Sequence, residues 1–373
     1  MPYGPETPAH VAIIGAGNIA RRYVEGMGRY PQLRLIGCAD VVQPMADALA
    51  ADAGIRAYTS VDELVADPDV DIVVNITPPT AHAAVTSQAL AAGKHVYVEK
   101  PIAATVAESK SMLAAAAAHR RTIGSAPDTF LGSAGQTARA AIDRGVIGEP
   151  IGATAFVTHS KAETWHPDPT FLFQPGGGPA LDLGPYYLTT LVNMLGSVAA
   201  VAGFTRVGAP VRPVTAPDRR VDTVEVTTPT HWGATLKFRS GTIGTLLMSF
   251  DVWDSHLPKI EVYGTAGTLT VPDPNEFDGD VTLRLHSEDD WRVLEPVIAP
   301  SGAAGTPAQY LRGMGVADLA AAIDGAPHRA SAALATHVLE VIEAIQVASD
   351  SQSVVHIDST VPRPAPMERA VPS

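Results

Sequence analysis

The chain has 373 residues, of which 46% are hydrophobic and 17% are charged, and its formal net charge is −13. This composition is that of a globular protein, and the length predicts two domains, each with its own core. The excess of acidic over basic residues, 39 against 26, disfavours nucleic acid as a partner. The single cysteine, Cys38, excludes an intrachain disulfide, and we expect no metal site.

The sequence shows neither a signal peptide nor, as we interpret it, a run of the ~18 apolar residues that a membrane-spanning helix needs. A lone cysteine is typical of a reducing compartment. We therefore expect a cytoplasmic protein that binds a small molecule and has no nucleic-acid or membrane partner.

Between residues 11 and 126, short apolar runs alternate with helical patterns. The expected strands are residues 11–15, 34–40, 71–77 and 95–100. The expected helices are residues 19–28, 44–54, 79–93 and 104–120. Strict alternation of strand and helix predicts a parallel sheet covered on both faces, and we place this first domain at residues 1–128.

After residue 128 most segments alternate apolar and polar residues, which predicts a largely antiparallel sheet, with residues 240–242 as a hairpin turn. The expected helices of this part are residues 134–144, 180–195, 308–324 and 330–348, and a last strand covers 353–357. We place an α+β domain at residues 129–362 and a proline-rich, mobile tail at 363–373.

Residues 15–20 read GAGNIA, which is the spacing G-x-G-x-x-A directly after a predicted strand and at the start of a helix. Such a turn needs Gly15 for its tight backbone and Gly17 for close approach of a phosphate. A small Ala20 lets the helix pack on the strand. The turn is therefore a candidate dinucleotide site, formed by Gly15, Gly17, Asn18 and Ile19.

Asp40 ends the second predicted strand, where a carboxylate can accept hydrogen bonds from the adenosine ribose hydroxyls. The residues that follow it, VVQP, include no arginine to pair with a 2′-phosphate, and the charge of Asp40 would repel that phosphate. NAD is therefore favoured over NADP as the cofactor. The alternative is that Asp40 merely ends a strand in a polar turn.

Further candidate residues stand at the ends of the third and fourth predicted strands, in TPPTAH and YVEKP. Open parallel sheets bind ligands outside the carboxyl ends of their strands, so these residues lie at the correct edge to reach the nicotinamide half of the cofactor. They are Thr77, Pro78, Glu99 and Lys100. His82, in the first turn of the next helix, either contacts the cofactor or packs locally.

The fingerprint, T-P-x-x-x-H, E-K-P and an acid inside D-x-G after a glycine-rich loop resemble, in order and spacing, the Gfo/Idh/MocA family of NAD(P)-dependent oxidoreductases. The resemblance spans nearly the whole chain, and E-K-P is its most telling motif. It implies a Rossmann domain followed by a domain with a large open-faced sheet, often used for dimer or tetramer contacts. It also implies hydride transfer at a carbinol carbon, commonly of a sugar or cyclitol.

By this resemblance Lys100 hydrogen-bonds the reacting oxygen beside the nicotinamide, and Glu99 binds ribose hydroxyls. Asp182 matches the aspartate of the family motif D-x-G-x-H, but the position of its histidine is Tyr186. The tyrosine is similar to a branch that includes glucose-fructose oxidoreductase and dimeric dihydrodiol dehydrogenase. We expect Asp182 and Tyr186 to share one helix face after a side-chain-free wall of three glycines, 176–178. The alternatives are a helix cap for Asp182 and a core position for Tyr186.

We expect Tyr186 to act as acid and base, Lys100 to lower the pKa of that phenol and polarise the substrate oxygen, and Asp182 to orient a neighbouring hydroxyl. Three further residues are either substrate contacts or ordinary loop residues, namely Asp128, Trp165 and His166. The predicted function is an NAD-dependent dehydrogenase or reductase acting on a secondary alcohol of a sugar, cyclitol or cyclic diol. The alternatives are a glycoside hydrolase that uses NAD for transient oxidation and a non-catalytic nucleotide sensor.

Overall fold

The computed structural model describes residues 3–160, 162–300 and 312–367. The chain divides into two compact units, with a boundary between Leu131 and Gly132 and a second one inside the long helix α11, after Thr336. The first unit therefore combines the N-terminal part of the chain with residues 312–336. The second unit contains the rest of the described residues.

The first unit is built on a six-stranded parallel sheet with the strand order β3-β2-β1-β4-β5-β6. Its strands are β1 (Ala9–Ile14), β2 (Leu33–Ala39), β3 (Arg56–Ala57), β4 (Ile72–Asn75), β5 (His95–Val98) and β6 (Ile123–Ser125). The residues of β4 and nearly all of β1 and β5 are buried, as a sheet covered on both faces requires. The predicted Rossmann-type sheet is confirmed.

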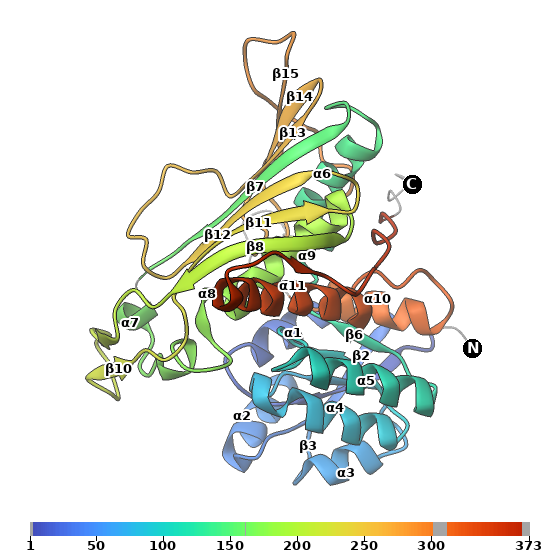
Figure 1. The fold of residues 1–373 in the computed structure, drawn as a ribbon. Helices are drawn as coiled ribbons and strands as arrows, with labels where there is room; N and C mark the ends of the chain where they lie inside the picture. The colour runs from blue at the N-terminus through green and yellow to red at the C-terminus, as the bar shows by residue number, and fades with distance from the viewer. Residues whose placement is uncertain (1–2, 161, 301–311, 368–373) are drawn as a thin grey trace. The chain divides into compact units, whose positions relative to one another are not determined.

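Helices flank this sheet (Figure 1). They are α1 (Ala20–Met27), α2 (Gln43–Ala53), α3 (Val61–Ala66), α4 (His82–Ala91), α5 (Val106–His119) and α10 (Met314–Ile323), with short 3₁₀ turns η1 (Pro79–Ala81) and η2 (Thr129–Leu131). The α5 helix begins in a capping box of Thr105 and Glu108. The short β3 and α3, between 56 and 66, were not predicted. The predicted start of α10, at 308–311, lies outside the described residues.

The second unit contains a nine-stranded sheet with the order β16-β15-β14-β13-β7-β12-β11-β8-β17 (Figure 1). Its strands are β7 (Pro150–Thr158), β8 (Val198–Arg206), β11 (His231–Phe238), β12 (Ile243–Ser249), β13 (Ile260–Gly264), β14 (Gly267–Val271), β15 (Thr282–Leu285), β16 (Arg292–Val293) and β17 (Val355–His356). Only β12 and β7 pair in parallel, so the mostly antiparallel sheet is confirmed. The predicted hairpin turn joins β11 to β12, with Gly241 at φ 95°. Two further strands, β9 (Val211–Pro213) and β10 (Thr223–Glu225), form a separate ribbon.

One face of the large sheet carries the core of the second unit. Burial alternates along β11 and β12, and the inward residues form one apolar cluster with α6 (Ser133–Asp143), α9 (Gly184–Leu195) and α11 (Ala332–Ser351). The other face is open, and Phe204 and Ile243 are 68% and 45% exposed. The remaining helical turns of this unit are α7 (Ala162–Trp165), η3 (Thr170–Leu172) and α8 (Gly178–Asp182).

The helix expected over 180–195 is in fact two helices, α8 and α9, that meet at Leu183. Leu183 has φ −110° and ψ −27°, and the Tyr186 N–H donates to the Leu183 carbonyl in a tight turn. Pro185 explains the break, because proline has no N–H to donate to the preceding turn. The prediction of one continuous helix was therefore wrong at this point.

Among the described residues one helix, α11, is long and apolar enough to cross a membrane by length and composition alone. Its most apolar window is 67% buried within the structure, as in a core helix. After β17, residues 363–367 form neither helix nor strand, but they are held by hydrogen bonds. Arg139 Nη1 donates to the Pro364 carbonyl at 2.8 Å, and the Met367 N–H donates to Gln136 Oε1 at 2.8 Å. The rest of the predicted tail, 368–373, lies outside the described residues.

Candidate active site

The glycine turn between β1 and α1 lies where the order of the parallel sheet reverses, with β2 on one side of β1 and β4 on the other. A side chain at Gly15, which has φ 104°, would lie 2.9 Å from the Ile76 backbone, so this position needs glycine. A side chain at Gly17 would meet no atom within 4 Å, and no side chain caps the start of α1 at Ile19. An open space beside an uncapped helix N-terminus fits a pyrophosphate.

Asp40 follows β2 and contacts the same turn. Its Oδ2 accepts a hydrogen bond from the Ala16 N–H at 2.7 Å, and its Oδ1 accepts one from the Val42 N–H at 2.8 Å. Each carboxylate oxygen has a further lone pair, so both oxygens can still accept ribose hydroxyls. Asp40 thus combines the polar-turn role and the geometry for the predicted ribose role.

The loop after β4 is organised by a buried amide that sequence analysis missed. Asn75 is 0% exposed, and its Oδ1 accepts hydrogen bonds from Thr77 Oγ1 at 2.7 Å and Thr77 N at 3.3 Å. Its Nδ2 donates to the His82 carbonyl and to Thr86 Oγ1, both at 3.1 Å. The buried Asn75 therefore holds the loop that contains Thr77 and the exposed Pro78 in place. The available signal was an asparagine at the end of an otherwise apolar strand.

The loop after β5 carries Glu99 and Lys100. Glu99 is 8% exposed, and its Oε1 accepts a hydrogen bond from the Tyr23 hydroxyl at 2.9 Å. Its Oε2 accepts one from the backbone N–H of Lys100 at 2.8 Å. Burial, and then the neighbouring Glu99, raise the pKa of Tyr23 well above its usual value, so the phenol stays a donor. Tyr23, on the buried face of α1, is a second residue that sequence analysis missed.

His82 is 1% exposed, and both of its ring nitrogens contact backbone carbonyls. Its Nδ1 lies 2.8 Å from the Pro101 oxygen, and its Nε2 lies 2.8 Å from the Thr77 oxygen. Burial lowers the pKa of the ring. These contacts favour local packing, the alternative to a direct cofactor contact.

Asp128 is fully buried beneath the start of α10. Its Oδ2 accepts hydrogen bonds from the N–H groups of Gly315 at 2.9 Å and Gly313 at 3.3 Å, and burial raises its pKa. This geometry gives Asp128 a structural role as the carboxylate that caps α10 and lends no support to a substrate contact.

In the second unit, the break at Leu183 places the two predicted catalytic residues in different helices. Asp182 is the last residue of α8 and is half-buried, whereas Tyr186 lies in the first turn of α9 and is 6% exposed. Tyr186 belongs to the apolar core cluster, together with Tyr187. The Tyr187 hydroxyl donates to Asp273 Oδ1 at 3.3 Å, and burial raises the pKa of that phenol.

The three glycines at the start of α8, residues 176–178, differ in how much space a side chain would have. A side chain at Gly177 would lie 2.3 Å from the Phe171 carbonyl oxygen, and one at Gly178, which has φ 81°, would lie 3.0 Å from the Pro229 oxygen. Only Gly176, at φ 92°, faces open space. The glycines therefore serve mainly close backbone packing, and the expected side-chain-free wall is limited to Gly176.

Trp165 and His166 belong to a short run of aromatic rings around α7 and η3. The ring of His166 lies edge-on to Trp165 at 5.4 Å and to Phe171 at 5.2 Å, and Trp165 and Phe171 are each 58% exposed. The Nδ1 of His166 accepts a hydrogen bond from the Asp168 N–H at 3.1 Å. In the neutral ring the proton is therefore on Nε2, which is a hydrogen-bond donor. Phe171 was not predicted.

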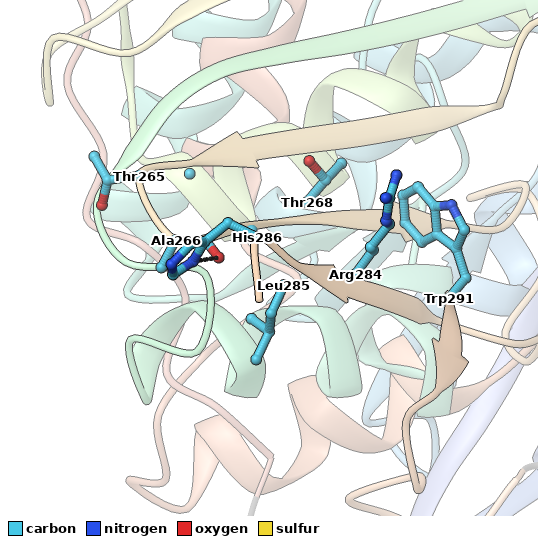
Figure 2. Close-up of a pocket in the computed structure, with 9 residues that line it drawn as sticks. Thr265, Ala266, Thr268, Arg284, Leu285, His286 and Trp291 are labelled. Carbon is cyan, nitrogen blue, oxygen red and sulfur yellow. Dashed lines mark hydrogen bonds between the residues drawn. The ribbon is translucent and has the colours of Figure 1, made fainter. Parts of the chain in front are cut away.

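Within the described residues, no group of three histidine, cysteine, aspartate or glutamate side chains could hold a metal ion. A hollow of about 380 Å³ lies at the turn between β13 and β14. Figure 2 shows the residues that line it. It is lined by residues of β14 and β15 and by Trp291, and none of the predicted site residues lines it.

Comparison with protein families gives two matches. Residues 9–126 match the oxidoreductase family GFO_IDH_MocA, described as an NAD-binding Rossmann fold. Residues 136–270 match the C-terminal domain of the same family. The two matches agree with the order in which the two sheets occur along the chain.

Two curated relatives have names that identify them as enzymes acting on sugars. The 1,5-anhydro-D-fructose reductase of Ensifer adhaerens is 35% identical over 193 residues, which are 51% of this chain and 57% of the relative. The galactose 1-dehydrogenase of Pseudomonas fluorescens is 30% identical over 190 residues, which are 50% of this chain and 58% of the relative. The matches thus span little more than half of these relatives.

A solved structure is similar over almost its whole length. Levoglucosan dehydrogenase in complex with NADH and levoglucosan superimposes with a TM-score of 0.82 at 20% identity, covering 94% of this chain and all of that chain. At this level of identity the similarity establishes the fold alone.

Proposed function

Because the chain belongs to the Gfo/Idh/MocA family of oxidoreductases, with an NAD-binding Rossmann fold in its first unit, we propose that it transfers hydride between NAD and a secondary alcohol of a sugar, cyclitol or cyclic diol. The observation that carries this proposal is the ordered loop after β5. Glu99 fixes the backbone of Lys100 at the sheet edge where such sheets bind nucleotides. The sugar-directed names of the relatives support the substrate class.

NAD, when bound, accepts the hydride of the alcohol. The alcohol must also lose its hydroxyl proton, and we assign Tyr186 as the base that accepts it. We assign to Lys100 a hydrogen bond to the same oxygen. Asp182 accepts a hydrogen bond from a neighbouring hydroxyl and so orients the ring.

Residues of the first unit form the rest of the proposed nucleotide site. Gly17, Asn18 and Ile19 offer backbone to the pyrophosphate, and Asp40 accepts ribose hydroxyls. The negative charge of Asp40 favours NAD over NADP. Thr77, Pro78 and Glu99 line the nicotinamide half.

The aromatic run of the second unit supplies a surface for the sugar. A pyranose can stack on the exposed face of Trp165, while His166 Nε2 donates to one of its oxygens. Trp165 is suited to this role because it is exposed, and His166 because its Nε2 is a hydrogen-bond donor. The buried Asp128 is not assigned to the substrate.

The test is a panel of sugars, inositols and dihydrodiols, followed by the absorbance of the reduced nicotinamide with NAD and NADP in parallel. We expect turnover of at least one alcohol with NAD, and weaker activity with NADP. An inactive panel together with release of p-nitrophenol from p-nitrophenyl glycosides would instead identify an NAD-dependent hydrolase. An inactive panel with demonstrable NAD binding and no hydrolysis would leave a nucleotide sensor.

We further propose that the protein is a cytoplasmic homodimer or homotetramer that pairs through the open face of the large sheet. Phe204, Gly233 and Leu247 lie in one row across β8, β11 and β12, on the side opposite the core. Such an apolar row is typical of a covered surface. Phe204→Glu should shift the mass measured by light scattering toward the monomer, whereas an unchanged mass would exclude this face.

A further inference from the structure

Two loops of the first unit present residues to the nicotinamide half of the proposed site, one after β4 with Thr77 and one after β5 with Glu99 and Lys100. The ring of His82 contacts the backbone on both sides. Its Nε2 lies 2.8 Å from the Thr77 oxygen, and its Nδ1 lies 2.8 Å from the Pro101 oxygen. The ring therefore spans the space between a residue of the first loop and the residue that follows Lys100.

The ring is itself held firmly. His82 begins α4, and its own carbonyl accepts a hydrogen bond from Asn75 Nδ2 at 3.1 Å. Asn75 also fixes Thr77 through its Oδ1. Because the side chain is 1% exposed, water cannot easily replace either ring contact. A neutral ring carries one N–H and donates to only one of the two carbonyls, so a change in the ring moves at least one loop or removes that hydrogen bond.

From these contacts we propose that His82 is a positioning residue, whose imidazole lies between the Thr77 and Pro101 carbonyls and so sets the spacing of the two loops for NAD. The inference rests on the proposed use of these loops in cofactor binding, but it does not require His82 to touch the cofactor. It explains how a buried histidine serves the site through backbone contacts alone.

The direct test is His82→Gln, with NAD binding measured by calorimetry in the absence of any alcohol. Glutamine carries its two donors on one nitrogen and cannot span both carbonyls. The loss of one buried contact should weaken NAD binding by about tenfold. The affinity of the variant for NAD would overturn the proposal if it stayed within about twofold of the wild type.

His95→Gln is the matched control. His95 is a partly buried histidine of the first unit, and its Nδ1 accepts a hydrogen bond from the Thr122 N–H at 3.1 Å, outside the two loops. A glutamine oxygen can replace that acceptor. We expect NAD affinity to stay near the wild-type value in this variant, and an equal loss in both variants would reduce His82 to a general structural role.

A second measurement needs no variant at His82. In protein labelled with ¹⁵N-histidine, NAD should shift the ring nitrogen signals of His82 and leave those of His95 in place. The two carbonyls beside the ring belong to the loops proposed to bind NAD, so NAD binding should be felt at the ring without direct contact. A His82 ring that does not respond to saturating NAD therefore contradicts the proposal even if His82→Gln fails to fold. Both measurements use NAD alone, so an inactive alcohol panel would refute the proposed reaction without affecting them.

Discussion

The sheet edge of the first unit and the α8–α9 turn of the second unit are built by different forces. At the sheet edge, polar side chains hold one another and the backbone through hydrogen bonds, as Asn75, His82 and Glu99 do. At the α8–α9 turn, glycines allow close backbone packing, Pro185 ends one helix, and Tyr186 lies in an apolar cluster. The first region is pre-organised by topology, whereas the second depends on how its core packs.

This difference matters for the chemistry that each region can perform. A nucleotide site needs backbone groups in fixed positions, which the ends of parallel strands supply. An acid–base residue needs a controlled pKa, which burial and nearby charge supply. Changes at the sheet edge should therefore alter NAD binding, and changes at the α8–α9 turn should alter turnover or stability.

The largest effect is expected at Tyr186. Tyr186→Phe removes the proposed base and should lower kcat by ~10²-fold or more, with NAD affinity nearly unchanged. Tyr187→Phe is the control, because it removes a buried phenol of the same helix that pairs with Asp273. Steady-state kinetics and NAD titration measure both effects. Turnover near the wild-type level in Tyr186→Phe would remove this residue from the reaction.

The next effect concerns the glycines before α8. Gly177→Ala places a methyl group 2.3 Å from the Phe171 carbonyl oxygen, and the required shift should lower the free energy of unfolding by about 2 kcal/mol or more. Gly176→Ala meets open space and only strains a backbone at φ 92°, which costs about 1 kcal/mol. Urea unfolding compares the two. The reverse order of stability would contradict the packing role.

A smaller effect is expected at Tyr23. Tyr23→Phe removes the hydrogen bond to Glu99 Oε1 and leaves that buried oxygen without this donor. The loss should weaken NAD binding by about fivefold, which corresponds to about 1 kcal/mol. Calorimetric titration with NAD measures it, and Tyr187→Phe again serves as the control. An unchanged affinity would show that Glu99 does not depend on α1.

The last prediction concerns the stability of the protein at low pH, to which one histidine in each unit contributes. Burial lowers the pKa of His95 in the first unit and of His337 in the second from 6.5 to about 4. The unfolded chain therefore binds more protons below pH 6.5, so stability is fully present above pH 6.5 and decreases as the pH falls toward 4. We expect Tm to fall by a few °C over this range. His95→Gln and His337→Gln should each make the decrease of Tm with falling pH less steep. Parallel curves of Tm against pH for the wild type and both variants would show that these histidines do not cause the decrease.

Much of the first unit could be predicted from the sequence, because strand ends in a parallel sheet must meet at one edge. Gly15, Asp40 and Thr77 were placed there from motif position alone. Tyr23 and Asn75 were not found, because no motif in the sequence marks a residue that acts as a buried hydrogen-bond partner. The contacts of Asp128 were not found for a related reason, since its partners, Gly313 and Gly315, are distant in sequence.

The second unit was harder to predict in its details. The antiparallel sheet and its hairpin followed from alternation and turn residues. The helix of 180–195 did not, because the apolar pattern of the segment outweighed the single Pro185. The close approach of the Phe171 backbone to Gly177 depends on tertiary packing, which local sequence does not encode.

The central claim is that Lys100 and Tyr186 act on the same oxygen of the alcohol. A double-mutant cycle with Lys100→Met and Tyr186→Phe, measured as kcat/KM for the best alcohol of the panel, tests it most directly. The account predicts that the double variant is hardly slower than the slower single variant, because each change already disables one shared step. Losses that multiply, as for independent residues, would contradict the claim.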